Sequence, residues 1–138
     1  MGGYAYNFFR YLETNDNGPV EGVRSVGTTA HTANASLFYT FQQGGAKGLK
    51  LGFSTYYTGK RNAGWNNTKV NVADGLNRLI PVEPFTTFDF SAGYGYKNWS
   101  ILGKISNIGN AFNYYVHENY SVNPIPPRSF TTTLSYRF

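Results

Sequence analysis

Apolar and polar residues alternate along most of this chain, and the alternation has a period of two. The clearest stretch covers residues 88–96, where Phe88, Phe90, Tyr94 and Tyr96 are separated by small or polar residues. In an extended chain successive side chains point to opposite faces, so this pattern predicts a β-strand with one apolar face.

The same pattern recurs and predicts an all-β fold. Six strands are expected, near residues 3–13, 30–42, 49–59, 85–97, 98–109 and 128–138. No segment has the 3.6-residue period of an amphipathic helix. We therefore predict an antiparallel meander, in which each strand pairs with its neighbour in sequence.

The connections between these strands alternate in length. Short turns are predicted at 43–47 and 97–98, whereas long, mostly polar stretches cover about 15–27, 60–83 and 110–127. Transmembrane β-barrels have short turns at one end, long loops at the other, an apolar outside and a polar interior. The apolar face would then contact lipid. A β-sandwich or a small barrel that folds alone and binds a ligand or partner stays open, because period two does not distinguish lipid from a second sheet.

The composition indicates that something other than water covers much of the protein surface. Charged residues make up 14% and aromatic residues 18% of the 138 residues, whereas soluble domains are about a quarter charged. The chain has no Cys, which excludes a disulfide framework and a thiolate metal site. Its N-terminus lacks the basic-then-apolar layout of a secretion signal, so we expect Met1 to open a fragment or a protein that is not exported. The net charge is +5, but the cations are scattered, with only Lys60 and Arg61 adjacent, so nucleic acid is not an expected partner.

Several stretches resemble the closing strands of TonB-dependent outer-membrane receptors, and siderophore receptors are the nearest branch. They cover residues 84–96, 98–100, 106–115, 127–130 and 135–138, and residues 26–33 and 57–61 resemble earlier receptor strands in the expected order. Ile108 stands where the family usually has Leu, which is a small departure.

This resemblance implies that residues 1–138 are the C-terminal segment of a barrel of about 22 strands, without the plug and the earlier strands. It also implies a location in the outer membrane of a Gram-negative bacterium and a role in transporting a ferric siderophore or a similar scarce nutrient. The implied partners are the rest of the barrel and plug, the TonB complex acting through that plug, barrel-assembly machinery and outer-membrane lipid.

Catalysis is not expected. Asp89 is the only carboxylate in the interior of a predicted strand, since the other six lie in or beside the long connections. No pair of carboxylates has the spacing of an acid and a base. His31 and His117 are far apart, so no metal site and no cofactor is predicted.

Ligand binding is the better candidate, because the long loops hold cations and aromatic rings that suit an anionic or aromatic chelate. The candidate ligand-binding residues are Arg61, Trp65, Tyr114, Tyr115, His117, Tyr120 and Arg128. Packing within the loops, or a place in an aromatic belt at the membrane interface, is the alternative for each of them.

The chain ends on an aromatic residue. Leu134, Tyr136 and Phe138 share the apolar face of the last strand, and this ending resembles the signal that barrel-assembly machinery reads in outer-membrane proteins. The predicted aromatic belt at the short-turn end also includes Tyr96 and Trp99. The belt at the long-loop end is expected to begin with Tyr57 and Phe85.

Overall fold

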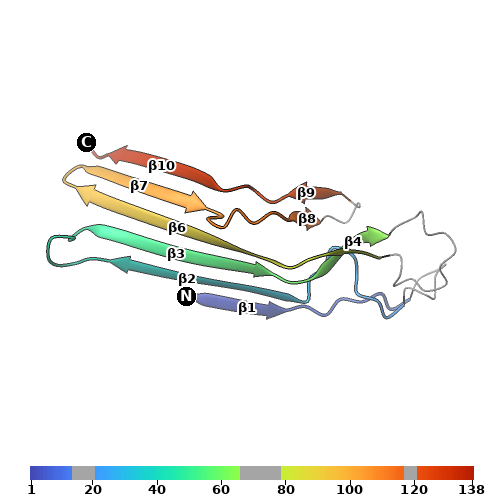
Figure 1. Ribbon diagram of the computed structural model, residues 1–138. Coiled ribbons are helices and arrows are strands. Elements are labelled where there is room, and N and C mark those ends of the chain that lie inside the picture. The colour runs from blue at the N-terminus through green and yellow to red at the C-terminus, as the bar shows by residue number, and fades with distance from the viewer. Residues whose placement is uncertain (14–20, 66–78, 117–120) are drawn as a thin grey trace.

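The protein is built around a single antiparallel sheet. The structure, a computed structural model, describes residues 1–13, 21–65, 79–116 and 121–138. Six strands form the main sheet: β1 (Gly2–Tyr6), β2 (His31–Thr40), β3 (Leu49–Thr58), β6 (Phe85–Tyr96), β7 (Trp99–Ser106) and β10 (Ser129–Tyr136). They lie in the order β1-β2-β3-β6-β7-β10, and every neighbouring pair is antiparallel (Figure 1). The predicted six-strand meander is confirmed.

Two short ribbons extend from the main sheet. β4 (Arg61–Trp65) pairs with β5 (Leu79–Val82), and β8 (Tyr114–Val116) pairs with β9 (Val122–Pro124). Figure 1 shows both ribbons at the end of the sheet opposite the tight β2–β3 and β6–β7 turns. The pattern of short turns at one end and long connections at the other is confirmed, but the long connections contain strands that period two did not predict.

The tight turns depend on residues that adopt left-handed backbone conformations. Gly44 and Gly48 have φ values of 71° and 92° in the β2–β3 turn, and Lys97 has a φ of 51° in the two-residue β6–β7 turn. These conformations reverse the chain within a few residues. The turns therefore set the register in which apolar residues meet across the sheet.

Two of the predicted strands end earlier than expected. The first was expected to run over 3–13, but β2 begins at His31, opposite Tyr6, so the residues after Tyr6 have no partner in β2. They run instead beside the loop that precedes β2, where Arg10 and Arg24 form an isolated bridge. β7 was expected to reach residue 109, but it ends at Ser106 because Asn107 has a φ of 50°, outside the β region.

The main sheet has no second layer within the described part of the chain. The buried apolar residues there are Val26, Ala63 and Ile125, and all three lie outside its strands. This arrangement does not fit a β-sandwich, whose core lies between two facing sheets. No helix of the described residues is long and apolar enough to cross a membrane.

Candidate functional site

The two faces of the sheet differ in chemistry, and the strand register makes each face continuous. One row on the apolar face crosses five strands and joins, in order, Leu37, Phe53, Phe90, Ile105 and Phe130. Four of these five side chains are exposed to more than a third of their area. A contiguous exposed apolar patch of this kind marks a surface that contacts lipid or another molecule.

An aromatic cluster closes the apolar face at the tight-turn end. The Trp99 and Tyr136 rings are 4.7 Å apart between centroids, and the Tyr136 and Phe138 rings are 5.1 Å apart. Tyr96 lies opposite Trp99, and the Lys97 ammonium is 5.3 Å from the Tyr96 ring. The structure therefore brings together the residues expected in this aromatic belt, with Leu134 one step farther along the same face.

The opposite face is mostly polar and carries an ion pair. Lys104 Nζ lies 2.9 Å from Asp89 Oδ2, and the Ser36 and Ser54 hydroxyl oxygens are 2.9 Å apart. A shallow hollow of about 420 Å³ lies beside the ion pair, with Lys50 and Tyr56 among its lining residues.

Phe38 departs from the polar character of this face. A Cβ at Gly52 would lie 2.7 Å from Cδ1 of the Phe38 ring, so the ring occupies the space that a side chain at Gly52 would fill. Glycine at this position lets an aromatic ring lie flat across the neighbouring strand.

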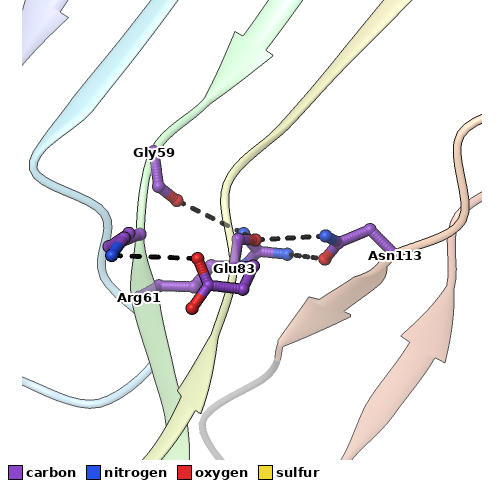
Figure 2. Close-up of polar contacts among 5 residues, drawn as sticks. Gly59, Arg61, Glu83 and Asn113 are labelled. Carbon is purple, nitrogen blue, oxygen red and sulfur yellow. Dashed lines mark hydrogen bonds and ion pairs between the residues drawn. The ribbon is translucent and has the colours of Figure 1, made fainter.

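Arg61 joins the two ribbons at the loop end. Its side chain is 6% exposed. Nη2 donates to Asn113 Oδ1 at 2.7 Å, and Nη1 donates to the carbonyls of Gly59 and Glu83 at 3.3 and 3.4 Å (Figure 2). Nη2 also donates to the Tyr114 carbonyl.

Phe85 completes the surroundings of this guanidinium. The Arg61 guanidinium carbon lies 5.2 Å from the centre of the Phe85 ring, and the centres of the Tyr115 and Phe85 rings are 6.4 Å apart, with the rings inclined at 69°. Burial lowers the pKa of Arg61, although an arginine keeps its charge under ordinary conditions. Phe85 was expected in the outer aromatic belt with Tyr57, but the register pairs it with Thr58, on the polar side. The Phe85 ring instead lies against the Arg61 guanidinium group.

Asn107 is a second polar centre, which the sequence pattern did not single out. It is 5% exposed, and its Nδ2 donates to the carbonyls of Ala111 and Pro126 at 2.9 and 3.0 Å. Its Oδ1 accepts from the Ala111 N–H at 2.9 Å, and its own N–H donates to Asp89 Oδ1 at 3.0 Å. Asn107 thus fixes the connection between β7 and β8 and the segment that leads to β10. The resemblance covered this residue, but single-sequence periodicity carries no signal for such a role.

The other candidate ligand-binding residues are scattered over the loop end. Tyr114 and Tyr115 are both exposed in β8, and Arg128 is exposed where the chain enters β10, with its backbone N–H donating to Asn110 Oδ1 at 3.0 Å. Trp65 ends β4, but its side chain lies outside the described residues, as do His117 and Tyr120.

A second hollow, of about 390 Å³, lies between the two ribbons. Among the candidate residues that the structure describes, only Tyr114 lines it, and the apolar residues Ile80, Phe112 and Val122 line it as well. Those three were not predicted, because isolated apolar residues in a loop have no periodicity to reveal them. No group of three His, Cys, Asp or Glu residues within the described ranges could hold a metal ion.

Comparison with known proteins gives matches in structure only. No protein-family model matches the chain, and no curated protein matches its sequence. Among solved structures, the chain is similar to BauA, the ferric preacinetobactin receptor of Acinetobacter baumannii, with a TM-score of 0.72 and 18% identity over 91% of this chain.

Two structures of related receptors match as well. P. aeruginosa FpvA bound to heterologous pyoverdines has a TM-score of 0.64 and 18% identity over 82% of this chain. FpvAI in its complex with pyocin S2 has a TM-score of 0.65 and 17% identity over 86%.

The chain spans only a small part of these proteins, 17% of BauA and 15% of each of the other two. The chain therefore has the fold of a segment of the β-barrel wall of TonB-dependent siderophore receptors, as its sequence resemblance predicts.

Proposed function

We propose that this chain is the C-terminal part of the barrel wall of a TonB-dependent outer-membrane transporter, which admits a ferric siderophore or a similar scarce nutrient. One observation carries the proposal: an open, one-layered sheet with a bare apolar face and a polar reverse face has the fold of siderophore-receptor walls over most of its length. A soluble domain would have to cover such a face.

In this proposal the apolar face contacts outer-membrane lipid, and the polar face lines the lumen. The two unpaired edges, β1 and β10, pair with the remaining strands of the barrel, since an exposed sheet edge does not persist within a bilayer. Barrel-assembly machinery reads the terminal Leu134, Tyr136 and Phe138. The TonB complex acts through a plug that belongs to the rest of the receptor.

The ligand reaches the end of the sheet that carries the two ribbons. Tyr114, Tyr115 and Arg128 are exposed there, which supports contact with a ligand. Trp65, His117 and Tyr120 stay predictions. For Arg61, the near-complete burial and the four oxygen acceptors support a positioning role, in which it holds β8 against β4 and so places the two tyrosines.

The test uses the intact receptor that carries this chain. Cells that depend on this receptor are given radioactive iron bound to a panel of catecholate, hydroxamate and mixed chelates, and uptake is measured with and without TonB. We expect TonB-dependent uptake from at least one chelate. Folded barrel at the cell surface that takes up none of them, and that competes for none in a binding assay, would contradict the proposal.

A further inference from the structure

The hollow of about 420 Å³ on the polar face is built entirely from the main sheet. Its lining residues all lie in β2, β3, β6 and β7, within the part of the chain that the structure describes. Small-molecule sites in proteins have volumes of about 300–1,000 Å³. The hollow is therefore large enough for a small molecule or for one group of a larger ligand.

Two apolar side chains border the hollow, and each extends over a glycine of the neighbouring strand. A Cβ at Gly52 in β3 would lie 2.7 Å from Cδ1 of the Phe38 ring, and a Cβ at Gly93 in β6 would lie 3.3 Å from Cδ1 of Leu102. Phe38 and Leu102 are both exposed. The hollow thus offers an uncovered aromatic ring and an uncovered aliphatic side chain on a face that is otherwise polar.

A lysine lies beside both of these apolar side chains. Lys50 is exposed, it is opposite Gly93 in the register, and it is two residues from Gly52 on the same face. It lines the hollow. The ion pairs of the described residues are those of Lys60 and Lys104, and Lys50 takes part in neither.

The carboxylates of the chain are either engaged or far from Lys50. Asp89 lies 2.9 Å from Lys104 Nζ, and the other six belong to or flank the long connections, which leave the sheet at the end opposite the tight turns. Lys50 is the second residue of β3 after the tight turn, and Thr58 at the far end of β3 is roughly 26 Å away at about 3.3 Å per residue. The charge of Lys50 is therefore available to an anion from outside this chain.

We propose that this hollow binds an organic anion that carries an aromatic ring, with the ring against Phe38 and the anionic group paired with Lys50. Aromatic rings pack favourably on each other, and an ammonium group forms strong hydrogen bonds to a carboxylate. The inference rests on the proposed function and deepens it, because it gives an anionic ligand a second contact on the polar face. Lys50 lies near the tight turns, so this contact comes after the ligand has left the ribbons.

The experiment uses the intact receptor in phosphatidylcholine nanodiscs and three probes. Benzoate has a ring and a charge, benzamide has the ring alone, and acetate has the charge alone. Saturation-transfer NMR titrations measure their dissociation constants, with empty nanodiscs as the blank. The variants are Lys50→Gln and Phe38→Ser. The matched controls are Lys47→Gln, an exposed cation of the β2–β3 turn outside the hollow, and Leu37→Ser, the neighbour of Phe38 on the apolar face.

We expect the wild type to bind benzoate about three- to fivefold more tightly than benzamide or acetate. Lys50→Gln should abolish the advantage over benzamide, because an ion pair that stays partly open to water contributes up to about a fivefold factor in affinity. Phe38→Ser should abolish the advantage over acetate, since the ring then has no aromatic partner. Both controls should keep both advantages.

Two outcomes would overturn the inference. Equal binding of benzoate and benzamide by the wild type would show that the hollow takes no anion, as expected if another segment of the receptor fills it. Equal losses in Lys50→Gln and Lys47→Gln would show that general positive charge attracts the probe. Neither outcome touches the proposed function, which TonB-dependent iron uptake by the wild type tests separately. Benzoate bound as expected by a receptor that takes up no chelate would contradict the proposed function alone.

Discussion

The six-stranded main sheet, here called the wall, and the end that carries the β4–β5 and β8–β9 ribbons, here called the ribbon end, are stabilised by different kinds of contact. In the wall, contacts are repeated and interchangeable: each strand adds one more member to rows of apolar residues, and each pairs with a neighbour in sequence. At the ribbon end, a few buried polar groups make single, long-range contacts, such as the one from Arg61 to Asn113 across 52 residues. The effect of a substitution on stability should therefore depend, in the main sheet, on whether its face meets lipid or water. At the ribbon end it should depend on which specific contact is lost.

The largest effect is expected from a charge on the apolar face. Leu37 and Phe38 are adjacent in β2 and similarly exposed, at 73% and 68%, but they lie on opposite faces. Leu37→Arg should destabilise the barrel by about 2–4 kcal/mol if its face meets the middle of a bilayer. Phe38→Arg should cost much less, because its face meets water. Unfolding in urea from phospholipid vesicles measures both, and equal losses would contradict the assignment of the two faces.

The second largest loss of stability is expected from substitution of Arg61. Arg61→Met removes the guanidinium donor from the carbonyls of Gly59 and Tyr114, and a buried polar group without a partner costs about 1–3 kcal/mol. The Glu83 carbonyl and Asn113 Oδ1 also lose Arg61 but keep the Asn113 amide and the Tyr114 N–H as donors. We expect faster hydrogen exchange in β8 and β4 with little change in β2 and β3. The control is Arg128→Met, which removes an exposed arginine with no described side-chain contact. Arg61→Lys should rescue only in part, since an ammonium lacks the planar fork of donors.

A smaller effect is expected at Asn107, where backbone and side chain can be separated. Asn107→Gly keeps a residue that accepts a φ of 50° but removes three side-chain hydrogen bonds, whereas Asn107→Ala also strains the backbone by about 1–2 kcal/mol. Hydrogen exchange at Ala111 should rise in both variants, and the alanine variant should lose more stability. Equal stability of the two would show that the left-handed conformation carries no cost here.

The sequence predicts the wall well because its physics is local and periodic. Alternation marks each strand, the short connections at 43–47 and 97–98 mark two reversals, and neighbours in sequence become neighbours in the sheet. The ribbon end has no such regularity. Arg61 was expected to contact a ligand as a loop cation, and its partners, the amide of Asn113 and three backbone carbonyls, cannot be inferred from the spacing of residues. The ligand roles of Tyr114, Tyr115 and Arg128 stay predictions for the same reason.

The smallest loss of stability is expected from the ion pair between Lys104 and Asp89 on the polar face of the main sheet. Lys104 is 49% exposed and Asp89 is 15% exposed in their side chains, so water screens the attraction between them. Lys104→Met should cost less than about 1 kcal/mol, as for most exposed pairs. Asp89→Ala should cost more, because Asp89 Oδ1 also accepts the backbone N–H of Asn107 and alanine has no acceptor in its side chain. A double-mutant cycle, measured by urea unfolding in vesicles, separates the two contributions. A coupling energy well above about 1 kcal/mol would mean that water does not reach the ion pair. That result would contradict the assignment of this face of the sheet to water.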